Sequence, residues 1–139
     1  MKNWQETTAI YGELARLTAD AKTAALATLI RVQGSSYRRP GAKLLIGDDG
    51  SLTGNVSGGC LEADLCERGQ RVIRTGVPEP VHYETGEEDG VLWGLGLGCN
   101  GTIDLFLQPA MSGDWREHTA GVMKLLDGDT PFGLRTVIE

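Results

Sequence analysis

The sequence has no long apolar run, few cysteines and histidines, and no excess of basic residues. No stretch approaches the roughly 18 apolar residues that span a membrane, and residues 1–6 carry no apolar signal-peptide core. Three cysteines are an odd number, which rules out a complete internal disulfide framework, and the lack of a Cys-x-x-Cys pair argues against a zinc ribbon or a thioredoxin-type site. A net charge of −6 argues against a nucleic-acid surface, which needs a basic stripe.

The bulk composition is that of one ordinary domain. A length of 139 residues suits a single hydrophobic core, and 40% hydrophobic with 23% charged residues is typical of a globular protein in water. We therefore expect residues 1–139 to form one domain in the cytoplasm, where thiols stay reduced. Neither nucleic acid nor a membrane is expected as a partner.

Hydrophobic periodicity predicts three helices and a sheet. The expected helices cover residues 4–20, 60–74 and 114–126. The expected strands cover residues 24–33, 42–46, 51–55, 81–84, 91–93, 102–108 and 132–139. Because helices and strands alternate loosely and two hairpin-like turns interrupt the pattern, we expect the α/β class, a single domain with a mixed sheet flanked by helices.

Two cysteines are embedded in glycines, where the bare backbone lets a ligand approach closely. Cys60 follows Gly58 and Gly59 and is expected to open a helix, whose free N–H groups and dipole lower the pKa of a thiol. Glu62, in the first turn of that helix, either complements the dipole or bonds a ligand, and the sequence leaves both open. Cys66 faces another side of the helix and is interpreted as a core or partly exposed filler residue.

The second cysteine, Cys99, lies in Gly96–Gly101, which matches Gly-x-Gly-x-x-Gly. A dinucleotide fingerprint needs a helix directly after the motif, whereas residues 102–107 have the alternation of a strand. The Rossmann interpretation therefore fails. What remains is a loop of bare N–H groups that suits an anion, with a thiol in it, and an Asn100 that can tolerate a left-handed backbone or donate to a ligand.

A basic loop over residues 33–43 combines the Ser36 hydroxyl with the cations of Arg38, Arg39 and Lys43. Guanidinium groups bind phosphate or carboxylate in a bidentate manner. Loops that place cations beside glycines often bind oxyanions, so we expect this loop to hold an anionic ligand.

The other titratable residues give weaker signals. His82 and His118 have no partners at ligand spacing and are interpreted as structural or surface residues. The acidic residues gather over positions 79–89, so the fold is expected to separate a basic site from an acidic rim.

Three motifs in order carry a resemblance to a known family. They are Gly34-Ser35-Ser36-Tyr37-Arg38-Arg39-Pro40-Gly41-Ala42-Lys43, Gly54-Asn55-Val56-Ser57-Gly58-Gly59-Cys60-Leu61-Glu62, and Gly98-Cys99-Asn100-Gly101. Together they closely resemble the XdhC/CoxI family, over nearly the whole chain, as the family's N-terminal domain. The resemblance implies an accessory protein that binds the molybdenum cofactor (molybdopterin) as cargo. Such a protein assists sulfuration of the cofactor by a cysteine desulfurase and its insertion into a molybdenum hydroxylase apo-enzyme, such as xanthine dehydrogenase or carbon monoxide dehydrogenase.

The resemblance also implies a site, an assembly and a role. The role is that of a chaperone rather than an enzyme, the assembly is a homodimer, and the C-terminal Rossmann-like domain of many members is absent from residues 1–139. Either cysteine would face the molybdenum through its soft thiolate, and the cations would face the cofactor phosphate. The implied cofactor-binding residues are Cys60, Cys99, Gly58, Gly59, Glu62, Ser36, Arg38, Arg39, Lys43, Gly98, Asn100 and Gly101.

Two other functions are compatible with the residues. An activated Cys60 beside Glu62 could serve a thiol-dependent transferase or hydrolase acting on a phosphorylated small molecule, although no His or Asp partner for the thiol is evident. A non-catalytic dimerisation or docking module is the other alternative, with the expected terminal strand and the tryptophans as its surface.

Overall fold

The computed structural model describes residues 5–34, 38–57, 61–84, 101–110, 113–128, 132–136 and 138. The helices are α1 (Gln5–Ala19), α2 (Glu62–Thr75) and α4 (Gly113–Asp127). The strands are β1 (Ala24–Gly34), β2 (Lys43–Gly47), β3 (Leu52–Gly54), β4 (Glu79–Glu84) and β5 (Gly101–Pro109). The expected strand over 91–93 lies outside the described residues.

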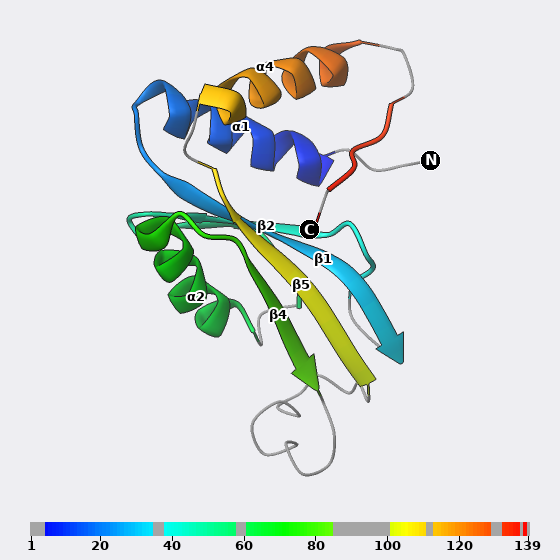
Figure 1. The fold of residues 1–139 in the computed structure, drawn as a ribbon. Helices are drawn as coiled ribbons and strands as arrows, with labels where there is room; N and C mark the ends of the chain where they lie inside the picture. The colour runs from blue at the N-terminus through cyan, green and yellow to red at the C-terminus, as the bar shows by residue number, and fades with distance from the viewer. Residues whose placement is uncertain are drawn as a thin grey trace.

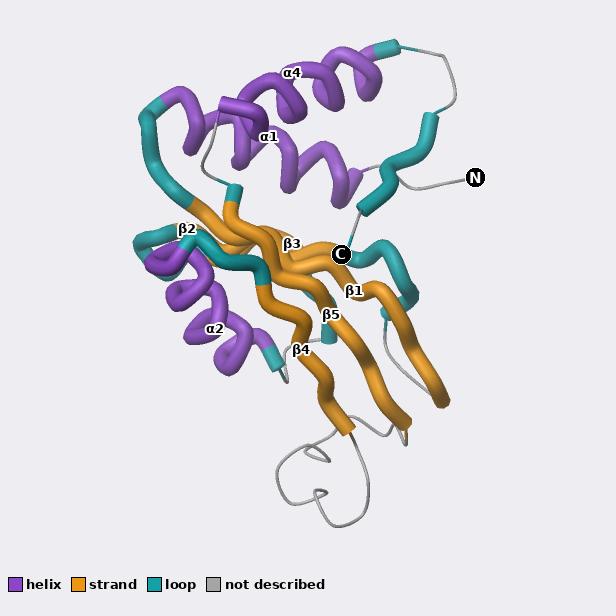
Figure 2. The backbone as a smooth tube through the Cα atoms, in the orientation of Figure 1, coloured by secondary structure: helices purple, strands orange, loops and turns teal. Residues whose placement is uncertain are grey.

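The five strands form one sheet in the order β3-β2-β1-β5-β4. Helices α1 and α4 cover one face of this sheet and α2 covers the other, which gives three layers (Figures 1 and 2). The predicted α/β class, with a sheet flanked by helices, is confirmed. The sheet is antiparallel at every described pair, however, where a mixed sheet was expected. The reason is that α2 joins β3 to β4 at opposite edges of the sheet, so it makes no parallel neighbours.

The core is divided between the two faces of the sheet. Strand β2 shows the division most clearly, because Leu44 and Ile46 pack toward α2 while Leu45 between them packs toward α1 and α4. Successive side chains of a strand point to opposite faces, and helices cover both faces here, so all of β2 is buried. Within the described part of the chain, no helix combines the length and the apolar character that crossing a membrane requires.

Two expected boundaries are wrong. Helix α2 begins at Glu62, with Leu61 at its N-cap, and not at Cys60. The described residues of the expected terminal strand, 132–136 and 138, are not in a strand. The Leu134 side chain packs instead against the core cluster on the side of α1 and α4. Partial burial of this apolar residue takes the place of the strand pairing that its alternating sequence suggested.

A close approach between β1 and β5 fixes the end of the sheet. Gly34 lies opposite Gly101 in the antiparallel register. A Cβ atom at Gly101, whose φ is +157°, would stand 1.9 Å from the carbonyl oxygen of Gln33. No side chain fits at that distance, so the residue that follows the Cys99 loop has to be glycine for β5 to begin here.

We expect Gly101→Ala to weaken the folded state by about 1–3 kcal/mol, since the added methyl group forces β1 and β5 apart at this end. Denaturant unfolding measures the loss. Gly121→Ala is the matched control: nothing lies within 4 Å of the added Cβ in α4, and alanine is favoured over glycine in a helix by about 1 kcal/mol. Equal stability of Gly101→Ala and the wild-type protein would contradict the close approach.

Candidate functional site

The described ends of the first and third motifs meet at one end of the sheet. Gly34, at the end of β1, lies opposite Gly101 at the start of β5, and Glu84 at the end of β4 lies opposite Thr102. The basic loop therefore begins where the Cys99 loop finishes. The loop that follows β3 is linked to the basic loop by Arg38, whose Nη1 atom bonds the carbonyl of Asn55.

Arg38 connects helix α1 to the loop after β3. Its two terminal nitrogens donate to the carboxylate of Glu6 at 2.9 and 2.7 Å, in a bidentate pair. The Nη1 atom also donates to the backbone carbonyl of Asn55 at 2.6 Å. The hydrogen bond to Glu6 raises the pKa of the guanidinium above its ordinary value. Much of the hydrogen-bonding capacity of Arg38 is thus used within the protein, where the sequence had suggested a ligand.

Glu62 fastens the same loop from the other side. Its Oε2 atom accepts hydrogen bonds from the backbone N–H groups of Val56 at 2.9 Å and Ser57 at 3.1 Å, and its Oε1 atom accepts from the Ser57 hydroxyl. The residue is only 9% exposed. Burial alone would raise the pKa of this carboxyl group, but the hydrogen bonds from Ser57 and Val56 lower it below its ordinary value. Glu62 thus closes a turn of its own chain, and the two roles left open, complementing the helix dipole and bonding a ligand, stay predictions.

The turn closed by Glu62 leads directly into the first cysteine motif. The Ser57 hydroxyl accepts a hydrogen bond from the N–H of Leu61 at 2.9 Å, so the residues on either side of Gly58-Gly59-Cys60 are joined. Both flanking residues are buried. Several predicted binding residues lie outside the described residues, and for these the sequence-based expectation stays a prediction: Ser36, Gly58, Gly59, Cys60, Gly98, Cys99 and Asn100.

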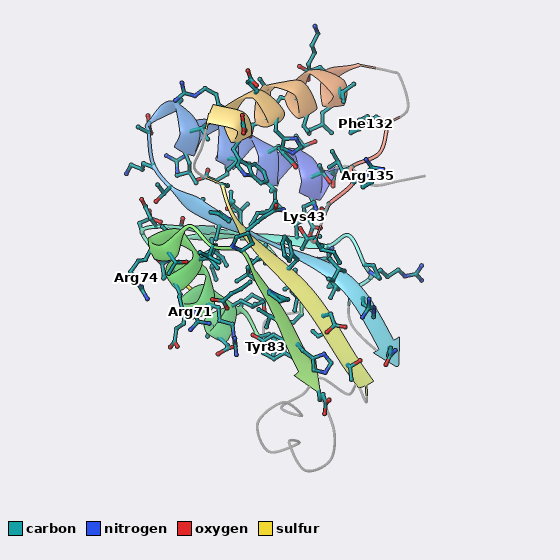
Figure 3. The ribbon with its side chains drawn as sticks, in the orientation of Figure 1. Lys43, Arg71, Arg74, Tyr83, Phe132 and Arg135 are labelled. Atoms are coloured by element: carbon teal, nitrogen blue, oxygen red, sulfur yellow. The ribbon has the colours of Figure 1, made fainter. Side chains whose placement is uncertain are left out.

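The basic loop lines a cavity of about 560 Å³ between the start of α1 and the segment 132–134. Arg38, Arg39 and Lys43 all contribute to its wall, so the structure does bring the three predicted cations to one cavity. They differ in environment: Arg39 is exposed, Arg38 is half-buried, and Lys43 is 8% exposed. Figure 3 shows Lys43 on the side of the sheet that α1 and α4 cover, with Phe132 and Arg135 on the same side.

The histidines and Cys66 are placed as follows. His82 is half-exposed on β4 and bonds Asp104 at 2.5 Å and Glu84 at 3.2 Å, as expected of a surface residue. His118 was also interpreted as isolated, but its Nε2 atom lies 2.8 Å from the Tyr11 hydroxyl. Helices α1 and α4 make this pair across 107 positions of sequence, a separation at which no local signal exists. Cys66 is partly buried against the core, which confirms its assignment as filler.

No group of three or more His, Cys, Asp and Glu side chains suited to a metal ion occurs among the residues that the structure describes. The predicted metal ligands, Cys60 and Cys99, fall outside that set.

Comparison with known proteins identifies a family. A sequence model of the XdhC and CoxI family matches residues 17–84. A Bacillus subtilis (strain 168) protein, named as a probable subunit of xanthine dehydrogenase, is 41% identical over 91 residues, which are 63% of this chain and 26% of that protein. The molybdenum cofactor insertion chaperone PaoD of Escherichia coli (strain K12) is 31% identical over 114 residues, which are 82% of this chain and 34% of that protein.

A solved structure agrees with these relatives. The crystal structure of a xanthine dehydrogenase from Bacillus halodurans superimposes with a TM-score of 0.71 at 39% sequence identity, over 86% of this chain and 35% of that one. The chain thus spans 26% and 34% of the lengths of the two curated relatives. The fold described above is shared with a protein of much greater length.

We expect Glu62→Gln to destabilise the protein at neutral pH by about 1.5–3 kcal/mol, the range for hydrogen bonds to a charged acceptor. Because the pKa of Glu62 is lower in the folded chain than in the unfolded chain, its contribution is present above the ordinary carboxyl pKa. It is lost as the pH falls through the lowered folded-state value. The difference in unfolding free energy between the two proteins should therefore shrink on acidification, which denaturation at a series of pH values measures.

Glu67→Gln is the control for the general effect of removing a carboxylate, since Glu67 is exposed on the same helix. It should leave the unfolding free energy nearly unchanged at neutral pH. A Glu62→Gln difference that stays constant down to acidic pH would contradict the charged-acceptor role of Glu62.

Proposed function

We propose that this chain, which residues 17–84 place in the XdhC and CoxI family, binds the molybdenum cofactor as cargo and serves in its maturation. One relative is named a molybdenum cofactor insertion chaperone and another is named as a probable part of xanthine dehydrogenase. The finer part of the proposal is that the chain assists sulfuration of the cofactor and its insertion into a molybdenum hydroxylase such as xanthine dehydrogenase or carbon monoxide dehydrogenase.

The observation that carries this proposal is that two charged side chains hold the loop 55–57 by hydrogen bonds to its backbone. Arg38 bonds the carbonyl of Asn55, and Glu62 bonds the N–H groups of Val56 and Ser57. Because charged groups hold this turn on both sides, the backbone at residues 55–57 would be a fixed starting point for the next residues, Gly58-Gly59-Cys60. Rigid support is what a binding loop needs to hold a large ligand in one orientation.

The chemistry of the neighbouring groups suits the cargo. A thiolate at Cys60 or Cys99 is a soft ligand that could face molybdenum or a transferred sulfur atom. The exposed guanidinium of Arg39 is the cation of the basic loop most open to an incoming phosphate, and the 560 Å³ cavity beside it falls in the usual range for small-molecule sites. Gly98, Asn100 and Gly101 would supply backbone N–H groups to the cofactor.

The proposal includes partners and a location. A cysteine desulfurase would supply sulfur to the bound cofactor, and a molybdenum hydroxylase apo-enzyme would receive it. The protein would act in the cytoplasm as a homodimer and release its cargo unchanged apart from the sulfur, so it would be a chaperone and not an enzyme with turnover of its own.

The test is the molybdenum and pterin content of the protein purified from a host that makes the cofactor. We expect the wild-type chain to retain both and Cys60→Ser to lose most of the molybdenum, because the hydroxyl is a harder and weaker ligand. Cys66→Ser is the matched control, since this thiol packs against the core on α2, and it should retain the wild-type amount. A wild-type protein free of molybdenum and pterin would refute the proposal, and equal retention in Cys60→Ser would exclude Cys60 as the thiol that faces the metal.

A further inference from the structure

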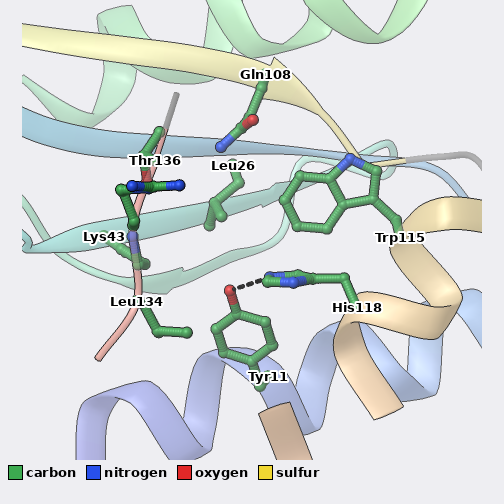
Figure 4. A pocket seen from close by; sticks show the side chains of 9 residues that line it. Tyr11, Leu26, Lys43, Gln108, Trp115, His118, Leu134 and Thr136 are labelled. Carbon is green, nitrogen blue, oxygen red and sulfur yellow. Dashed lines mark hydrogen bonds between the residues drawn. The ribbon is translucent and has the colours of Figure 1, made fainter. Parts of the chain in front are cut away.

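A second cavity, of about 200 Å³, lies between the sheet and the helices α1 and α4 (Figure 4). Each of these elements contributes to its wall, as does the segment 134–136. The residues that line it are Tyr11, Leu26, Lys43, Gln108, Trp115, His118, Leu134, Arg135 and Thr136. Among the described residues that line the cavity, the only charged side chains are the cations of Lys43 and Arg135, and none is a carboxylate.

Burying the ammonium group of Lys43 costs free energy unless an opposite charge compensates it. The residue is 8% exposed, and its ammonium group donates to the Thr28 hydroxyl at 3.2 Å. Among the described residues, no carboxylate lies within ion-pair distance of it. Burying an ion costs several kcal/mol unless an opposite charge compensates. Burial accordingly lowers the pKa of Lys43, and an anion in the cavity would supply the opposite charge that compensates the buried ammonium group.

The opposite wall of the cavity is aromatic and is held in place. His118 contacts the ring of Trp115 edge to face, with centroids 5.1 Å apart, and that of Tyr11 at 5.4 Å. The hydrogen bond of 2.8 Å between the Tyr11 hydroxyl and His118 Nε2 fixes both rings (Figure 4). Desolvation, with a smaller contribution from the Lys43 charge, lowers the pKa of His118 and favours its neutral form. This wall could therefore contact a flat ring of a ligand, while the cations Lys43 and Arg135 belong to other parts of the lining.

We propose that this cavity is a binding site for a small phosphate monoester that carries one flat ring. The phosphate would pair with Lys43, with Arg135 at the exposed mouth, and the ring would lie against Trp115 and His118. A cavity of about 200 Å³ is below the usual range of about 300–1,000 Å³ for drug-sized ligands, which limits the body of the ligand to about one ring. The site is built from the described helices and strands and does not depend on the cysteine loops or on the proposed function.

Phenyl phosphate is the probe, because it combines one ring with one phosphate. We expect saturable binding by calorimetry, together with a shift of the Trp115 indole N–H signal in the NMR spectrum, which is assigned by its absence in Trp115→Phe. Lys43→Met should weaken binding at least tenfold. This variant should fold, because methionine places an apolar chain of similar length in a buried position and removes a buried charge.

Two controls separate this site from others. Lys124→Met removes an exposed lysine of α4 and should leave phenyl phosphate binding unchanged. Cys60→Ser should also leave it unchanged, so a failure of the cofactor proposal would not affect this result. Inorganic phosphate should bind at least tenfold more weakly than phenyl phosphate, and phenol should not bind measurably.

Three results would overturn the proposal. The first is that phenyl phosphate fails to saturate the wild-type protein or shifts no Trp115 signal. The second is that Lys43→Met binds it as tightly as the wild type. The third is that inorganic phosphate binds as tightly as phenyl phosphate, which would mean that the aromatic wall takes no part.

Discussion

The buried carboxylate of Glu62 is the group on which the candidate site depends. Two backbone N–H groups and a hydroxyl converge on it from Val56 and Ser57, and the Ser57 hydroxyl in turn accepts from the N–H of Leu61. A buried polar backbone without partners costs free energy, so a single charged acceptor that serves several donors determines the path of this turn. Arg38 adds a second attachment at Asn55 and ties it to α1 through Glu6. The first cysteine motif therefore starts from a base that both α1 and α2 hold.

The three-layer fold gives the sheet two separate cores, and both cavities described above lie on the side of α1 and α4. Because α2 covers one face and α1 with α4 covers the other, neighbouring residues of β2 enter different cores. Lys43 is at the start of that strand and points to the side of α1 and α4, where it lines both the cavity of the basic loop and the smaller cavity beside His118. Figure 3 shows the contrast with Arg71, Arg74 and Tyr83, which lie on the side of α2.

The positions of helices and strands could be predicted from the sequence, because local patterns of residues determine them. Helices α1, α2 and α4 follow from apolar spacing, and the strands from 24, 43, 79 and 101 onward follow from β-branched runs and turns, within a few residues of the observed ends. Strand direction was missed, because it depends on which edges α2 connects. The partners of Arg38 and Glu62 and the pairing of Tyr11 with His118 were also missed, since each is a tertiary contact that leaves no periodic trace. A carboxylate two residues after Gly-Gly-Cys, with the Ser57 hydroxyl just before the glycines, could have suggested a turn closure.

The central claim is that the hydrogen bonds of Glu62 fix the conformation of the turn that leads into the cofactor-binding loop. The most direct test is the molybdenum retained per chain by Glu62→Gln, purified at neutral pH from a host that makes the cofactor and checked for folding by circular dichroism. The account predicts a folded protein that retains at most about a tenth of the wild-type molybdenum, which corresponds to a loss of about 1.4 kcal/mol in binding. A folded Glu62→Gln protein with the full wild-type content of molybdenum would contradict it.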